Sequence, residues 1–150
     1  MTVSANLKLA PDVIDRLTQF IRLKKGGLAR SRGLRVLAHI ELHLSSRLSN
    51  DELSQLAGLS IFHFGRAFRN SLGESPHSYV IRRRIELAQR LMLNSNLSLS
   101  QIAVDCGMAD QAHFCKLVRR FVGVTPNAWR RDQWDRISQS EAASGTLLAG

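Results

Sequence analysis

Residues 98–129 read SLSQIAVDCGMADQAHFCKLVRRFVGVTPNAW, and this stretch decides the expected fold. Ser98 and Gln101 form a capping box, which predicts the start of a short helix. Gly107 favours the end of that helix, because glycine readily adopts the left-handed conformation of a helix terminus. A longer helix is predicted from near Asp110 to the next glycine. Helix, tight glycine turn and longer helix is the helix-turn-helix pattern, whose second helix can enter a DNA major groove.

The rest of the stretch predicts one buried face and a third helix. Apolar side chains recur at three- and four-residue spacing in the longer helix and mark its buried stripe, namely Phe114, Leu117, Val118 and Phe121. Thr125 and Pro126 then have the residue types of a helix N-cap and of the first helical position. We expect Trp129 to pack this last helix, with Trp134 nearby.

The same pattern occurs a second time, in residues 49–79, which read SNDELSQLAGLSIFHFGRAFRNSLGESPHSY. Ser49 and Glu52 repeat the capping box, and the Gly-x-x-Pro exit recurs, while the second turn is one residue longer. The matched pairs are Leu53 with Ile102, Gly58 with Gly107, Phe64 with Phe114, Phe68 with Val118, Gly73 with Gly123, Pro76 with Pro126, and Tyr79 with Trp129. One helix-turn-helix match is a weak indication, whereas two in register are a strong one.

With these residues, the chain resembles the DNA-binding domain of the AraC/XylS family of bacterial transcription regulators. Three segments carry the resemblance: LSQLAGLSIFHFGRAFRNSLGESPHSY, RRRIELAQRLML and IAVDCGMADQAHFCKLVRRFVGVTP. It covers roughly residues 33–131, about two thirds of the chain. The resemblance implies an all-α fold of about seven helices, in which one long helix joins two helix-turn-helix units.

The expected domain organisation follows from these boundaries. An amphipathic helix over residues 11–24 and a basic linker make up residues 1–32, and the DNA-binding domain takes residues 33–132, with its first helix expected over 34–44. Its parts are a first unit over about 49–75, a linker helix over 76–94 and a second unit over about 98–131. Residues 133–150 are expected to form a disordered tail, because residues 138–150 are small, polar and uncharged apart from Glu141. The N-terminal helix is expected to pack on the first unit, with dimerisation as the alternative.

Composition favours a polyanionic partner. The 150 residues carry a formal net charge of +9, which points first to nucleic acid and second to an anionic membrane surface. No apolar run is long enough to span a bilayer and no secretory segment follows Met1, so we expect a cytoplasmic, nucleoid-associated protein. The two cysteines, and the pair His39 and His43, predict neither a disulfide framework nor a metal site. We expect no cofactor.

The resemblance implies base-contacting residues near the start of each recognition helix. In the first unit, Phe62, Gly65, Arg66 and Arg69 share one face of the helix over 61–72. The guanidinium of Arg66 matches guanine O6 and N7. Two interpretations stay open for Phe62, which can pack on a thymine methyl or in the core. Gly65, also a base-reading candidate, departs from the polar residue usual in the family and puts in doubt how much sequence this unit reads, although close approach to the DNA backbone would be a reason for a glycine.

In the second unit the corresponding face holds Gln111, Ala112, Cys115 and Lys116. Gln111 suits adenine N6 and N7, and Lys116 aligns with Arg66 and takes the same role. Candidates for phosphate contacts are Ser60, His63, Arg69, Arg82, Arg83, His113, Arg119 and Arg120. For Arg82 and Arg83 a solvated face is an equal alternative, whereas the resemblance marks Arg84 as structural.

The function expected is sequence-specific DNA-binding transcription regulation, with two recognition helices in adjacent major-groove segments. The expected partners are double-stranded DNA and RNA polymerase, with a monomer on DNA and a dimer through the N-terminal helix as the alternative. A second hypothesis is a helical adaptor that binds RNA polymerase or another regulator and touches DNA only non-specifically. We expect no enzyme, because no catalytic constellation stands in a suitable context.

Overall fold

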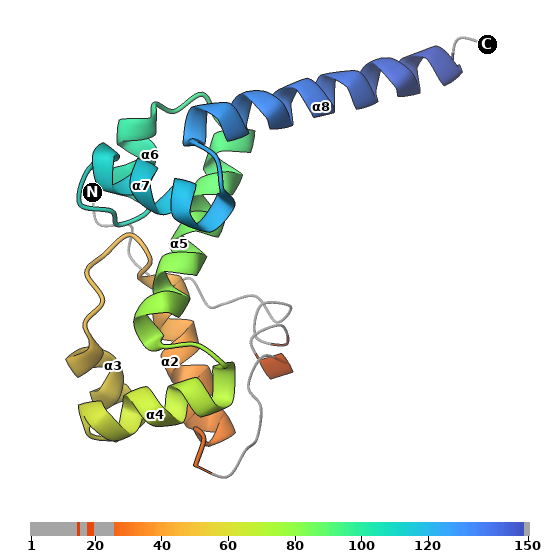
Figure 1. The fold of residues 1–150 in the computed structure, drawn as a ribbon. Coiled ribbons are helices and arrows are strands. Elements are labelled where there is room, and N and C mark those ends of the chain that lie inside the picture. The colour runs from red at the N-terminus through yellow and green to blue at the C-terminus, as the bar shows by residue number, and fades with distance from the viewer. Residues whose placement is uncertain (1–14, 16–17, 20–25, 149–150) are drawn as a thin grey trace. The chain divides into compact units, whose positions relative to one another are not determined.

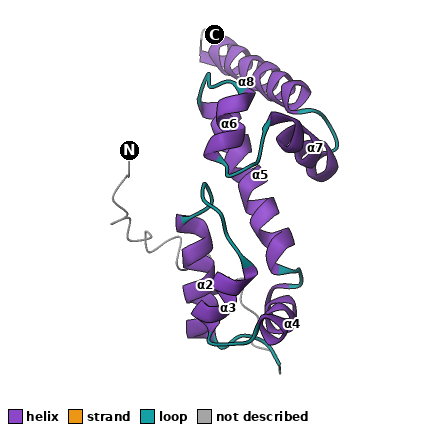
Figure 2. Cartoon of the chain, turned by 90° about the vertical axis from the view of Figure 1, so that its left-hand side faces the viewer, coloured by secondary structure: helices purple, strands orange, loops and turns teal. Residues whose placement is uncertain are grey.

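The computed structural model describes residues 15, 18–19 and 26–148, and this part of the chain is helical (Figure 1). Its helices are α2 (Arg30–Leu42), α3 (Asn50–Ala57), α4 (Ile61–Leu72), α5 (Pro76–Asn94), α6 (Leu99–Asp105), α7 (Gln111–Val122) and α8 (Pro126–Leu148). Figure 2 shows these helices joined by loops, with no strand among the described residues. The predicted all-α fold of about seven helices is confirmed. Most of the helix predicted over residues 11–24 lies outside the described residues.

The chain divides into two compact units between Arg83 and Arg84, and α5 runs through the division. Unit 1 contains α2, α3, α4 and the first half of α5. Unit 2 contains the second half of α5 with α6, α7 and α8. Each helix-turn-helix pair therefore belongs to its own unit, α3–α4 to the first and α6–α7 to the second.

The core of unit 1 is built on aromatic side chains that the sequence pattern placed inside. The rings of Phe64 and Phe68 lie 5.6 Å apart, and Phe68 meets Tyr79 at the same ring separation, both in edge-to-face geometry. Apolar side chains of α2 and α3 complete this core, namely Val36, Leu37, Ile40, Leu53 and Ala57. The three aromatic rings hold α4 against α5.

Helix α2 begins earlier than the expected residue 34. Its first turn is Arg30 to Gly33, and the amide of Gly33 donates to the carbonyl of Ala29 at 2.9 Å. The basic segment predicted as linker is therefore partly helical. Ahead of it, two hydrogen bonds fix residues 26–28, which we call the strap, to the last turn of α4. Leu28 N donates to Ser71 Oγ at 2.7 Å, and Asn70 Nδ2 donates to the carbonyl of Gly26 at 3.2 Å.

The core of unit 2 repeats this plan with smaller side chains. Phe114 and Val118 of α7 are fully buried, as predicted, in a core with residues of α5, of α6 and of the C-cap of α6, namely Ile85, Ala88, Met92, Ile102, Ala103 and Cys106. The prediction that Phe121 is buried was wrong, because 41% of its surface is exposed. The matching position in unit 1 is Ser71, which the strap covers. In unit 1 the strap and α2 precede the helix-turn-helix in the chain, whereas in unit 2 the helix α5 precedes it.

Cys106 is buried in unit 2, and Arg84 is half-buried there. Burial, followed by the nearby negative charge of Asp105, raises the pKa of the Cys106 thiol to about 12. Burial also lowers the pKa of Arg84 from its ordinary value. Cys106 is thus an unreactive core residue, and Cys115 is half-buried on α7.

Helix α8 continues to Leu148, whereas residues 133–150 were expected to form a disordered tail. The segment contains no proline, and its alanines, arginine, glutamine and glutamate are good helix formers. Arg136 pairs with Asp132 one turn earlier at 3.1 Å. Local helix propensity therefore extends α8 although nearly every residue from 131 to 145 is exposed. Within the described residues, every helix is too short or too polar to cross a membrane.

Candidate nucleic-acid interface

Two N-caps set the start of the recognition helices α4 and α7. Ser60 Oγ accepts the amide of His63 at 3.3 Å, and Asp110 Oδ1 accepts the amide of His113 at 2.7 Å. A capping side chain satisfies a donor that the first turn of a helix leaves without a partner. The carboxylate of Asp110 is therefore committed to its cap, although an acidic residue beside DNA is otherwise unfavourable.

The shorter helices α3 and α6 show only half of the predicted capping boxes. Ser49 and Ser98 accept the amides of Glu52 and Gln101, each at 3.2 Å. The reciprocal side chains take other partners. Glu52 Oε1 lies 2.8 Å from His39 Nε2, and Gln101 Nε2 donates to an oxygen of Asp105 at 2.8 Å. The caps position both turns, while Glu52 additionally ties α3 to α2.

Glycines with positive φ close the turns in both units. Gly58 has φ 66° and Gly107 has φ 71°, and residues that carry a side chain rarely adopt such positive values. Gly73 and Gly123 end α4 and α7 in the same way, with φ 80° and 93°. The repeated caps and turns give the two recognition helices the same length of twelve residues each.

The face of α4 predicted to read bases is open. Phe62 has 70% of its surface exposed, so the interpretation of Phe62 as a core aromatic was wrong. The guanidinium carbon of Arg66 lies 5.5 Å from the centre of the Phe62 ring. This cation–π contact supports the long arginine side chain above the helix surface. Gly65 lies between them in sequence, and Arg69 is exposed one turn further on.

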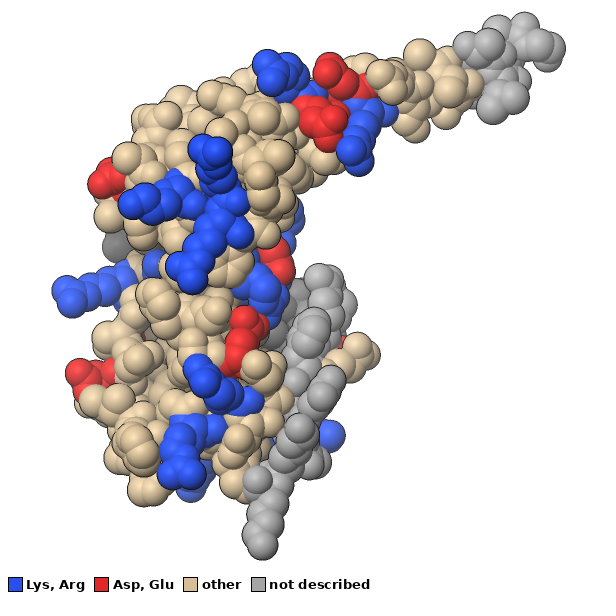
Figure 3. Space-filling model, viewed as in Figure 1, with Lys and Arg blue, Asp and Glu red and all other residues tan. Residues whose placement is uncertain are grey.

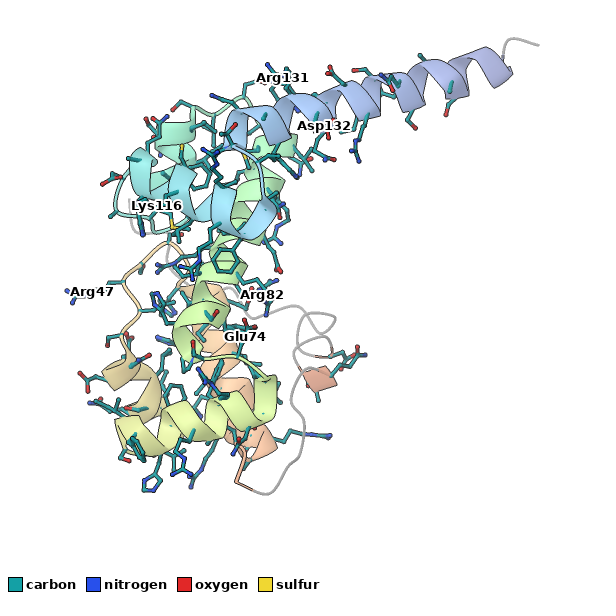
Figure 4. All side chains as sticks on the ribbon, in the orientation of Figure 1. Arg47, Glu74, Arg82, Lys116, Arg131 and Asp132 are labelled. Atoms are coloured by element: carbon teal, nitrogen blue, oxygen red, sulfur yellow. The ribbon has the colours of Figure 1, made fainter. Side chains whose placement is uncertain are left out.

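The face of α7 is built from smaller side chains. Ala112 and Lys116 are exposed, and in Figure 4 Lys116 projects from α7. The hydroxyl of Ser100, on α6, donates to Oε1 of Gln111 at 2.6 Å. The amide NH₂ of Gln111 keeps donors for a base acceptor, and its oxygen keeps a second lone pair that can accept from adenine N6 while it accepts from Ser100.

Both recognition helices are basic and contain no acidic residue. Helix α4 carries Arg66 and Arg69, and α7 carries Lys116, Arg119 and Arg120. Figure 3 shows lysine and arginine side chains over each of these two helices. Of the predicted phosphate contacts, six are exposed, namely Ser60, His63, Arg69, His113, Arg119 and Arg120. Ser60 Oγ also lies 2.9 Å from His63 Nδ1, so these two side chains share one polar group.

The remaining two phosphate candidates are held in ion pairs inside unit 1. Arg83 donates from Nε and Nη2 to the two carboxylate oxygens of Glu41, at 2.6 and 2.9 Å. Arg82 donates from the same two nitrogens to Glu74 Oε1, at 3.1 and 2.6 Å, and lies over the ring of Tyr79. Figure 4 shows Arg82 and Glu74 side by side. These partners favour a structural role, and phosphate contact by Arg82 and Arg83 stays a prediction.

Sequence reasoning missed Arg130, which organises unit 2. Its guanidinium donates to three backbone carbonyls that belong to the end of α5 and the loop after it. The bonds are Nε to Met92 O at 2.9 Å, Nη1 to Leu97 O at 2.8 Å, and Nη2 to Ser95 O at 2.5 Å. The ring of Trp134 lies 4.9 Å from the same guanidinium. Because Ser98 caps α6 directly after this loop, Arg130 fixes the entry to the second helix-turn-helix.

His39, in the last turn of α2, and His43, the C-cap of that helix, contact each other. The rings of His39 and His43 stack at 4.2 Å, and His43 Nδ1 bonds to the carbonyl of His39 at 2.8 Å. His39 meets Glu52, as described above. Among the described residues, no group of three or more potential ligands could hold a metal ion.

Comparison with known proteins relates this arrangement to a family. A family model described as a helix-turn-helix domain matches residues 53–132. The probable transcriptional regulator LumQ of Photobacterium leiognathi is 37% identical over 92 residues, which are 61% of this chain and 37% of LumQ. The HTH-type transcriptional activator AarP of Providencia stuartii is 33% identical over 95 residues, which are 63% of this chain and 70% of AarP.

Solved structures agree with these relatives. The DNA-binding domain of AdpA, a global transcriptional factor crystallised with a target DNA, superposes with a TM-score of 0.66 at 31% identity, covering 69% of this chain and 94% of that one. An AraC-type regulator from Chromobacterium violaceum gives 0.63 at 25% identity, covering 68% and 91%. The family model covers more than half of the chain, and the match to AarP covers 70% of that protein. The chain therefore belongs to the AraC-type helix-turn-helix family of DNA-binding transcription regulators.

Proposed function

We propose that the protein regulates transcription by binding a specific DNA site with both recognition helices, each in its own major-groove segment and the two segments adjacent. The observation that carries this proposal is the pair of exposed, basic, acid-free faces on α4 and α7, started by matching caps and turns. A single basic helix suits many anions, whereas two helix-turn-helix units suit a duplex. The family membership supports the same conclusion.

Specificity comes from four side chains in this proposal. In the first unit, Arg66 donates to guanine and the exposed ring of Phe62 packs on a thymine methyl. In the second unit, Lys116 donates to a guanine acceptor, and Gln111 donates from its amide to adenine. A good two-bond pair discriminates against the wrong base by ~1–3 kcal/mol, so these contacts suffice to select a site.

Affinity comes from phosphate contacts by the exposed basic and polar residues around the two faces. Arg69, Arg119 and Arg120 are cations at the C-terminal ends of the recognition helices, where they also complement the helix dipole. Each neutralised phosphate contributes about −0.9 to the slope of log affinity against log salt. Unpaired arginines therefore dominate this slope, and Arg82 and Arg83 contribute less because carboxylates already neutralise them.

Selection of bound duplexes from a random pool tests the proposal. The winner and a scrambled duplex are then compared at two salt concentrations. We expect a motif with two parts, and we expect Arg66→Ala to relax one part and Lys116→Ala the other. Equal affinity for the winner and the scrambled duplex would refute specific recognition. The adaptor hypothesis, in which DNA is only an electrostatic surface, would then be preferred.

We propose RNA polymerase as the protein partner and a monomer on DNA as the bound form. The chain spans 37% of LumQ and 70% of AarP, a transcriptional activator by its name. Exposed apolar side chains in unit 2, such as Val104 and Val124, support a protein contact. Sedimentation of the DNA complex measures the stoichiometry. Two chains per site would instead favour dimerisation, for which residues 11–24 are the predicted element.

A further inference from the structure

Glycine 65 is an unfavourable residue in the middle of a recognition helix. It lies within α4, which runs from Ile61 to Leu72. A glycine in a helix interior is less favourable than alanine by ~1 kcal/mol, because the unfolded chain loses more freedom on becoming helical. Such a position needs a reason, which lies either in the fold or in what the helix binds.

The fold supplies no reason. A glycine is required where φ is positive, but Gly65 is not among the glycines with positive φ. A glycine is also required where another part of the protein comes too close for a β-carbon. At Gly65 a β-carbon would meet no atom of the described residues within 4 Å. The position is moreover remote from the end of α4, where Gly73 already provides the terminus.

The position of Gly65 indicates the remaining reason. It shares one helix face with Phe62, one turn before it, and Arg69, one turn after it, and it directly precedes Arg66. This is the face that the proposed function turns toward DNA. Phe62 and Arg66 both extend from it and contact each other above the helix. Gly65, which has no side chain, thus lies on the helix surface beneath the two side chains that the proposed function assigns to base reading, Phe62 and Arg66.

We infer that Gly65 is a specificity-determining residue, which lets the backbone of α4 approach the edge of a base pair in the major groove. A β-carbon would add about 1.5 Å to the helix surface at this point and would hold Phe62 and Arg66 back from the bases. The inference rests on the proposed function and adds a residue to it. It also makes the two units differ, because the matching residue of α7 is the half-buried Cys115.

The test compares Gly65→Ala with Gly145→Ala as a matched control. Gly145 is also a helical glycine, exposed on α8, and a β-carbon there would likewise meet no described atom within 4 Å. Both substitutions are expected to leave the protein folded and to raise the Tm, by up to ~2–4 °C at Gly65 and by less near the end of α8. Only Gly65→Ala is expected to weaken binding of the selected duplex, by at least about tenfold.

Two further measurements identify the cause of the weaker binding. The salt slope is expected to stay the same in Gly65→Ala, because no phosphate contact is removed. A new selection with Gly65→Gln is expected to change only the part of the motif that Arg66→Ala also affects. Such results would assign the loss to base-edge approach in the first unit.

Three results would overturn the inference while the proposed function stands. Gly65→Ala can bind the selected duplex as tightly as the parent protein, which would make the glycine dispensable. It can lower the Tm, which would place the requirement for glycine in the fold. It can reduce the salt slope, which would make the loss electrostatic. A parent protein that does not distinguish the selected duplex from the scrambled one refutes the proposed function itself, before any variant is compared.

Discussion

Replacement of Arg130 by alanine should destabilise unit 2 more than any other single change to an arginine on its surface. The substitution removes donors from three carbonyls at once, those of Met92, Ser95 and Leu97. A hydrogen bond to a charged group contributes ~1.5–3 kcal/mol. The three bonds share one guanidinium, and water can replace it at the exposed Leu97, so they do not add fully. We expect a loss of about 3 kcal/mol in the free energy of unfolding.

The two tryptophans make this loss measurable in unit 2. Trp129 and Trp134 are the only tryptophans of the chain and both lie in α8. Unfolding followed by their fluorescence therefore reports on unit 2. A loss of about 3 kcal/mol lowers the Tm by roughly 6–12 °C for a chain of this size. Arg130→Lys keeps the charge without the planar fork and should recover part of the loss.

The neighbouring Arg131 is the control. It is exposed on the same helix, and Arg131→Ala should change stability by no more than about 0.5 kcal/mol. If Arg130→Ala is as mild as Arg131→Ala, the three carbonyls contribute little, and the reasoning that Arg130 fixes the entry to α6 is refuted.

Further predictions concern three arginines of the first unit and Cys106 of the second. Arg66→Ala should cost ~1–3 kcal/mol of discrimination at one base pair, whereas Arg69→Ala should weaken all duplexes alike and reduce the salt slope by about 0.9, as competition binding will measure. Arg83→Ala should lower the free energy of unfolding by about 2 kcal/mol and leave the salt slope unchanged, because its partner is Glu41. A shallower slope at unchanged stability would restore its predicted phosphate contact. Since the folded pKa of Cys106 is about 12 against an ordinary 9.0, its thiol stays protonated in the folded state while the unfolded thiol ionises. Stability should therefore fall as pH rises from about 9 toward 12, by at most ~1.4 kcal/mol per unit, and urea midpoints of Cys106→Ala should lack this component.

Local signals predicted the helix-turn-helix units closely. The sequence predicted the recognition helix over 61–72, and α4 has these bounds. Caps such as Ser60 and turn glycines such as Gly58 act within three or four residues, so their effect can be read without knowledge of the fold. The buried positions Phe64 and Phe114 followed from helical periodicity for the same reason.

Contacts between distant residues were not predictable in this way. Arg130 reaches carbonyls more than thirty positions earlier, and Arg83 pairs with Glu41 across forty-two. Helical periodicity shows on which side of a helix the apolar stripe lies, but it does not show whether another element packs over every residue of that stripe. For this reason Phe121 was wrongly predicted to be buried. Arg82 and Arg83 show why the phosphate contacts could not be fully predicted. The sequence does not distinguish a basic residue that binds a phosphate from one that pairs with a carboxylate of the protein.

The strap has a mechanical consequence. Because Gly26 and Leu28 are bonded to Asn70 and Ser71, the strap is fixed to the last turn of the first recognition helix. A force that acts on the strap is therefore transmitted to α4 through these two bonds. The amide hydrogen of Leu28, whose acceptor Ser71 Oγ is buried, should accordingly exchange with solvent only when the end of α4 opens.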